Sequence, residues 1–179
     1  MDRGPAGRDR DAAGRARNAR PRDALGRPLA RNAAGQPPVA DDAALPPEQT
    51  LAIAQQLLDD GLAFRAHEVL EAAWKAAPAA ERDLWQGLAQ LAVGLTHARR
   101  GNSQGAATLL RRGADRLSGY PATGPHGVDV AGLRRTAGSL ADRIEATGLA
   151  GLDAADLHLG LLAASATAPS EPSEPTGLG

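Results

Sequence analysis

The sequence predicts an all-α fold, a single bundle of five to six helices joined as antiparallel hairpins, with disordered tails at both ends. Three observations lead to this prediction. Apolar residues in the middle of the chain recur at the three- and four-residue spacing of a helix. Glycine, proline and helix-capping residues separate these segments by only a few positions, as in antiparallel helix pairs. No segment shows a convincing strand pattern.

The core is expected to consist of small aliphatic side chains. Hydrophobic residues make up 42% of the 179 residues, which suffices for one domain, but aromatic residues make up only 2%. Helices should therefore pack closely through Leu, Ala and Val. Phe64, Trp74 and Trp85 are three of the four aromatic residues, and they lie in one short region that we take as the centre of the core.

Charge and composition divide the chain into a body and two tails. Residues 1–35 contain nine Arg and four Asp, a balance of +5, whereas the remainder has eleven Lys or Arg against seventeen Asp or Glu, a balance of −6. The Arg-, Pro- and Gly-rich residues 1–45 and the Pro- and Ser-rich residues 163–179 have too few large apolar side chains to offset the entropy of ordering. We expect both segments to be disordered and residues 46–162 to form the helical domain.

The first two helices are predicted over residues 45–61 and 64–78. The first contains Pro47, which suits an initial helical turn, and Gly61, which ends it. The second has a broad apolar stripe and ends at Pro78.

A third helix is predicted over residues 81–101, because it begins with acidic residues and finishes with two arginines, as the helix dipole favours. The short stretch between this helix and the second predicts an antiparallel hairpin.

Asn102 is a suitable N-cap for a fourth helix over residues 103–117. Asp129 is a suitable N-cap for a fifth that continues to Gly148. Residues 153–163 are expected to add a short sixth helix.

The predicted hairpin has polar residues at helical spacing on both of its helices. Residues four apart share a helix face, so His67 stacks on Glu71, and a second polar stripe runs along the following helix. Folding at Pro78 should bring the two stripes together across an apolar interface. The predicted polar cluster or pocket comprises His67, Glu68, Glu71, Gln86, Gln90 and His97.

The run from Ala66 to Leu117 resembles the domain of unknown function 309 family. It has a His-Glu-x-x-Glu-x-x-Trp helix, a Gln-Gly-x-x-Gln segment, and a His before Arg-Gly-Asn-x-x-Gly-Ala. The resemblance covers residues 51–117 and implies an all-helical bundle without assigning an activity. The tails resemble those of actinobacterial members. Outside the polar cluster, the residues interpreted as a structural signature are Trp74, Trp85, Gly87, Gly101, Asn102, Gly105 and Ala106.

Three functional interpretations stay open. The first is a non-enzymatic binding or structural module, in which the cluster is a buried hydrogen-bond network and the hairpin offers a surface for a protein partner or small ligand. The second is a metal-dependent, hydrolase-like enzyme, with His67, Glu71 and His97 as ligands of a divalent transition metal and Glu68 as general base. The third is nucleic-acid binding through the Arg-rich residues 1–40.

Several other classes of function are disfavoured. The chain has no cysteine and no Gly-x-Ser-x-Gly motif, so neither a thiolate site nor a typical serine nucleophile is expected. It has no apolar run of the roughly 20 residues that span a bilayer, and we expect a cytoplasmic protein without membrane contact. No cofactor is expected other than the candidate metal. His126 and His158 are expected to face solvent, and the sequence leaves the oligomeric state open.

Overall fold

The computed structural model describes residues 23, 25–27, 29–30 and 45–163, and these residues form a bundle of α-helices. The only β-type pairings in this part of the chain are two isolated bridges. The predicted all-α fold is therefore confirmed. The α-helices are α1 (Pro47–Asp59), α2 (Ala63–Ala76), α3 (Arg82–Arg99), α4 (Ser103–Arg116) and α5 (Val130–Thr147), and the short 3-10 helices are η1 (Ala79–Glu81), η2 (Leu117–Gly119) and η3 (Pro125–Gly127).

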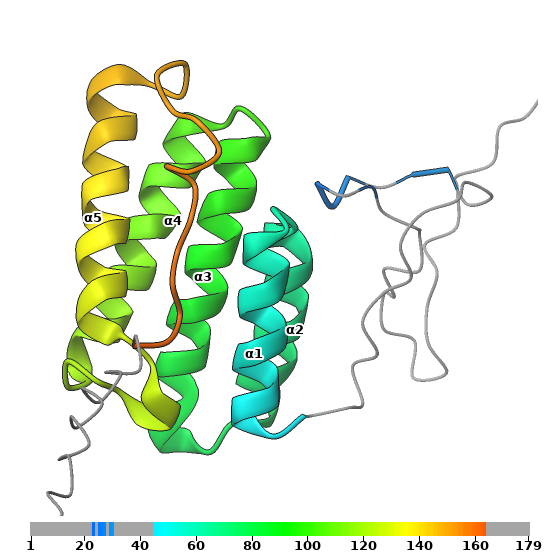
Figure 1. Ribbon diagram of the computed structural model, residues 1–179, viewed down its shortest axis with the longest axis vertical. Coiled ribbons are helices and arrows are strands. Elements are labelled where there is room, and N and C mark those ends of the chain that lie inside the picture. Colours follow the sequence, from blue (N-terminus) through cyan, green and yellow to red (C-terminus); the bar gives the residue numbers. More distant parts are fainter. Residues whose placement is uncertain (1–22, 24, 28, 31–44, 164–179) are drawn as a thin grey trace, which may run out of the picture.

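Each α-helix packs against its neighbours in the chain, so the bundle is a series of antiparallel hairpins (Figure 1). The predicted hairpin of the second and third helices is present as α2 and α3. Helix α3 packs against both α2 and α4, whereas α1 lies against α2 and α5 lies against α4. This central position explains why α3 contributes more buried residues than any other helix described here.

Glycine allows α3 and α4 to approach each other closely. A Cβ atom on Gly113 would lie 2.9 Å from the carbonyl oxygen of Gly87, and one on Gly87 would lie 3.2 Å from the carbonyl oxygen of Gly113. Because the two backbones nearly touch at this crossing, neither position has room for a side chain. Ala106 in the first turns of α4 is fully buried. A core poor in aromatic residues thus gains its contact area from close helix packing.

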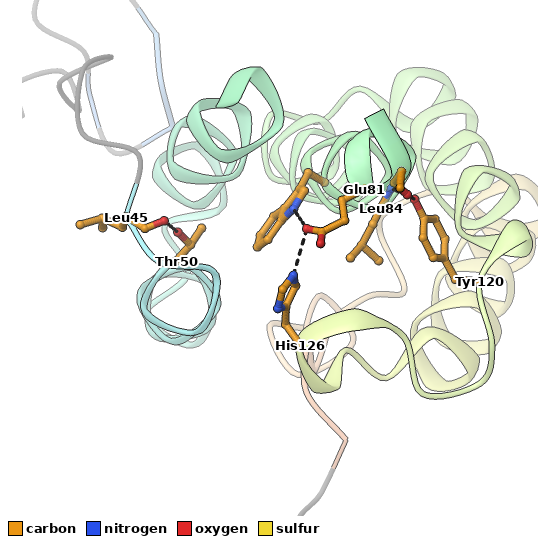
Figure 2. Close-up of polar contacts among 8 residues, drawn as sticks. Leu45, Thr50, Glu81, Leu84, Tyr120 and His126 are labelled. Atoms are coloured by element: carbon orange, nitrogen blue, oxygen red, sulfur yellow. Dashed lines mark hydrogen bonds and ion pairs between the residues drawn. The ribbon is translucent and has the colours of Figure 1, made fainter. Parts of the chain in front are cut away.

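The predicted helix caps are present. The side chain of Asn102 accepts a hydrogen bond from the Gly105 N–H at the start of α4. Asp129 likewise caps α5. Gly101, at a φ of 82°, ends α3 in a Schellman arrangement in which the Asn102 N–H donates to the His97 carbonyl. At the start of α1, the buried Thr50 hydroxyl donates to the Leu45 carbonyl (Figure 2).

The predicted sixth helix is absent. Residues 152–163, which we call the C-terminal strap, instead form turns and an extended segment between α1 and α5 (Figure 1). Leu159 and Leu161 are buried with exposed Gly160 between them, an alternation that an extended chain produces and a helix does not. The Leu161 N–H donates to the side chain of Gln55 on α1, and its carbonyl accepts from the N–H of Asp129. These tertiary hydrogen bonds replace the helical ones.

Most of the segments predicted to be disordered, 1–45 and 163–179, lie outside the described residues, and so does most of the nucleic-acid-binding candidate, 1–40. Of the N-terminal segment, the structure describes residues 23, 25–27 and 29–30. Asp23, Leu25, Gly26 and Arg27 belong to a turn that contacts the helical domain. At the other end, the Ala163 N–H donates to the Gly127 carbonyl.

Candidate functional site

The polar residues of α2 form a ladder along the helix. His67 Nε2 lies 3.7 Å from a carboxylate oxygen of Glu71, and Lys75 Nζ lies 3.4 Å from the other oxygen of the same group. These contacts follow from the four-residue spacing, which places the three side chains one above another. Exposure of the side chains rises along the ladder from 23% through 36% to 51%, so its His67 end is the most enclosed. Glu68 pairs with Arg65 at 3.8 Å beside the ladder.

His97 belongs to the turn between α3 and α4. Because Asn102 Oδ1 accepts from the Gly105 N–H, its Nδ2 is oriented to donate to His97 Nδ1 at 2.8 Å. His97 Nδ1 therefore acts as an acceptor and the ring proton lies on Nε2. A Cβ atom at Gly105 would collide with His97 Nδ1 and Asn102 Nδ2. His97, Asn102 and Gly105 are thus held against one another by hydrogen bonds and close packing, so each of them has a structural role.

The structure does not bury the predicted polar cluster. All six of its residues are partly exposed, and the buried polar side chains among the described residues are Thr50 and Thr96. The prediction of a buried network is therefore wrong. The physical reason is that α3 turns its leucines toward the core and its glycines toward α4, so the stripe of Gln86, Gln90 and His97 lies beside these packed faces and is only partly covered.

Trp74 and Trp85 have different environments. Trp85 is 2% exposed and belongs to the core, and Trp74 is partly buried against it.

The candidate metal ligands do not come together. Among residues 45–163 and the described part of the N-terminal segment, no group of three or more His, Cys, Asp or Glu side chains is arranged to hold a metal ion. His67 and Glu71 lie next to each other on α2. His97 instead forms a hydrogen bond with Asn102 at the turn between α3 and α4. The metal hypothesis, and with it the role of Glu68 as general base, therefore has no three-ligand group in this part of the chain.

Phe64, at the N-terminal end of α2, is the centre of a second group of contacts. Its ring meets the ring of His67 edge to face, with 6.0 Å between the centroids. The guanidinium carbon of Arg100 lies 5.6 Å from the Phe64 centroid, within the range of a cation–π contact. Arg100 also donates from both Nε and Nη2 to the carbonyl of Leu25 in the N-terminal turn. The sequence pattern placed Phe64 only in the core, and Arg100 only in the last turn of a helix, where its charge suits the helix dipole.

A third group, at the opposite end of α3, was missed by sequence analysis. A single carboxylate oxygen of Glu81 accepts from Trp85 Nε1 at 3.1 Å and contacts His126 Nε2 at 2.9 Å (Figure 2). The hydrogen bond to His126 is the main cause of the lowered pKa of Glu81. His126, expected to face solvent, is only 23% exposed and has a φ of 58°, an uncommon value for a residue other than glycine. The expectation for His126 is therefore wrong.

Tyr120 completes this end of the bundle (Figure 2). Its hydroxyl accepts from the Leu84 N–H at 3.0 Å and donates to the Ala80 carbonyl at 2.8 Å. The Leu84 N–H is one of the first amides of α3 and has no acceptor within the helix. A residue 36 positions away in the chain thus supplies part of the cap of α3.

The fold and these contacts define a helical-bundle protein with partly exposed polar groups at the ends of its central hairpin. The family model described as Domain of unknown function (DUF309) matches residues 51–109, and over this segment the chain is similar to that family. This result confirms the resemblance seen in the sequence. No curated protein and no solved structure matches the chain. Within the described residues, no helix has both the length and the apolar character needed to cross a membrane.

Proposed function

We propose that this protein is a non-enzymatic binding module. Its recognition surface is the end of the α2–α3 hairpin formed by Phe64, His67 and Arg100, which we call the hairpin surface. The observation that carries this proposal is the position of the chain's own N-terminal turn, residues 23–27, on Phe64 and Arg100.

Arg100 recognises a backbone group rather than a side chain. Its Nε lies 2.7 Å from the carbonyl oxygen of Leu25, and its Nη2 donates to the same atom. Hydrogen bonds from a charged donor are stronger than those between neutral groups. Because every residue has a backbone carbonyl, this contact favours peptides as ligands without selecting a sequence.

Phe64 supplies the selectivity that Arg100 lacks. Gly26 is buried, and a Cβ atom at this position would collide with the Phe64 ring. The φ of Gly26 is 74°, which other residues rarely adopt. The hairpin surface thus accepts a turn that contains glycine.

The turn also holds its own shape. Asp23 Oδ1 accepts from the N–H groups of Leu25 at 3.0 Å and Arg27 at 2.7 Å. A turn already held in its bound shape loses less entropy on docking. The buried hydrophobic core of the described residues extends from Leu51 to Leu161 in the sequence and contains no residue of the turn. The turn therefore lies on the outside of this core. A partner with a similar turn would find the same contacts.

The single phenylalanine of the chain allows a direct test. Replacing it with 4-fluorophenylalanine gives one fluorine resonance, which reports on the hairpin surface. In the full chain, Gly26→Ala should displace the turn and shift this resonance. A synthetic peptide of residues 20–31, added to the Gly26→Ala chain, should restore the original resonance.

The matched control is the same peptide carrying Gly26→Ala, which should have no effect. The proposal fails if the resonance is the same in both chains, or if the two peptides act equally. Either result would show that the hairpin surface does not select a glycine-containing turn.

A further inference from the structure

We propose that a hollow between α3 and α4 binds a small zwitterion, a molecule that carries a carboxylate and an ammonium group close together. The hollow has a volume of about 580 Å³, within the range of small-molecule sites. Its lining is charged, unlike that of most such sites, so a polar ligand fits it better than an apolar one. The lining residues are Asp83, Gln90, Arg112, Asp115 and Arg116.

Gln90 provides an unused acceptor at this site. Its Oε1 atom is covered from solvent and accepts no hydrogen bond within the described residues. An unpaired acceptor of this kind is costly. Because Gln90 lines the hollow, an ammonium group of a ligand bound there is a suitable donor for this oxygen.

The charged residues of the lining divide into two that form an ion pair with each other and two that form no ion pair within the described residues, which we call the available pair. Arg116 Nη1 lies 2.5 Å from a carboxylate oxygen of Asp83, so these two groups balance each other. Arg112 and Asp115, both exposed on α4, form no ion pair within the described residues. The neighbouring Arg111 shows the contrast, because it pairs with Asp142 and Glu145 of α5.

The available pair determines the class of ligand. A simple anion attracted by Arg112 would be repelled by Asp115, and a simple cation would meet the reverse. A zwitterion can place its carboxylate on Arg112 and its ammonium group between Asp115 and Gln90. An amino acid and the end of a short peptide share this chemistry.

The test is a titration of the ¹⁵N-labelled full chain with glycine, N-acetylglycine, glycinamide and glycylglycine, followed by NMR. Glycine should shift the side-chain amide of Gln90 and the backbone amide of Asp115 in a saturable manner. N-acetylglycine lacks the ammonium group and glycinamide lacks the carboxylate, so each should bind at least about tenfold more weakly, the loss of one charged contact. Tighter binding of glycylglycine than of glycine would identify a peptide end as the ligand, and the reverse would identify a free amino acid.

Variants separate this site from a hollow that holds solvent only. Arg112→Gln and Asp115→Asn should each raise the Kd of the better of these two ligands by about tenfold or more. Arg135→Gln, at an exposed position on α5, is the control and should leave the Kd unchanged. The proposal is overturned if no ligand gives a saturable shift at Gln90, or if the two lining variants behave like the control. The fluorine resonance of Phe64 reports separately on the hairpin surface, so failure of either proposal is distinguishable from failure of the other.

Discussion

Glu81 and His126 are 45 positions apart in the chain, and a carboxylate oxygen of one lies 2.9 Å from the imidazole Nε2 of the other. This contact joins the loop before α5 to the start of α3. Trp85 donates to the same carboxylate oxygen, and its ring centroid lies 6.0 Å from that of His126. The two hydrogen bonds lower the pKa of Glu81 from an ordinary value of 4.5. The stability of the bundle should therefore depend on the charge of Glu81.

The first prediction concerns Glu81→Gln and pH. A carboxyl group whose pKa is lower in the folded than in the unfolded chain stabilises the fold above the unfolded pKa, and this contribution is lost as the pH falls through the folded pKa. At about pH 7, Glu81→Gln should lower the free energy of unfolding by about 1 kcal/mol. The difference from the unchanged protein should shrink below about pH 4.5, in urea titrations followed by circular dichroism.

A second variant, His126→Asn, tests the same contact from the other side. Asparagine tolerates a positive φ better than most residues, so this change removes the imidazole without adding backbone strain. It should reproduce part of the loss seen in Glu81→Gln, and the two losses should not add. A difference between Glu81→Gln and the unchanged protein that stays constant through the acid range would contradict the prediction.

The second prediction compares two glycines within helices, Gly105 of α4 and Gly138 of α5. Alanine at Gly105 would collide with His97 and Asn102, and the imidazole can move away only by giving up its hydrogen bond. Gly105→Ala should therefore lower the free energy of unfolding by about 1–3 kcal/mol. Gly138 has open space around it, so Gly138→Ala should raise the same quantity by up to about 1 kcal/mol. Thermal unfolding measures both, and equal effects would mean that the His97–Asn102 contact does not confine Gly105.

The third prediction concerns the C-terminal strap. Gln55 accepts from the Leu161 N–H at 2.6 Å and donates to the Leu159 carbonyl at 3.2 Å. Gln55→Leu should lower the free energy of unfolding by about 1–3 kcal/mol and speed hydrogen exchange of the Leu161 amide, because that amide loses its acceptor. Gln56, whose side chain bonds to Asp60 on the same helix, is the matched control. Gln56→Leu should change stability by no more than about 0.5 kcal/mol, and slow exchange at Leu161 in the Gln55 variant would refute the role of this contact.

The positions of the helices were predictable because their signals are local. The observed α4 begins one residue after Asn102, and α5 one residue after Asp129, as the capping residues predicted. A capping residue bonds to backbone amides or carbonyls only a few positions away. The residues near a helix end are therefore enough to predict where the helix begins or ends.

The candidate site was predictable only in part. The four-residue spacing correctly placed His67 beside Glu71, since both lie on one helix. The same spacing placed Gln90 and His97 on one stripe but did not show which neighbour this stripe meets. In the structure Gln90 lines a hollow with charged residues of α4, and His97 closes the α3–α4 turn. Helical periodicity defines a face, and only packing defines what that face contacts.

The sequence by itself determined the five α-helices of the described residues, the caps of α4 and α5 and the family resemblance, because hydrophobic periodicity and capping act over a few residues. Tertiary structure alone decided that residues 152–163 form an extended strap, that Glu81 meets His126, and that the turn at residues 23–27 lies on Phe64 and Arg100. The hydrogen bonds Glu81–His126, Arg100–Leu25 and Leu161–Gln55 join residues 45, 75 and 106 positions apart. At such separations local conformational preference carries no information about the partner, and the contact forms only when the packed core has placed both groups.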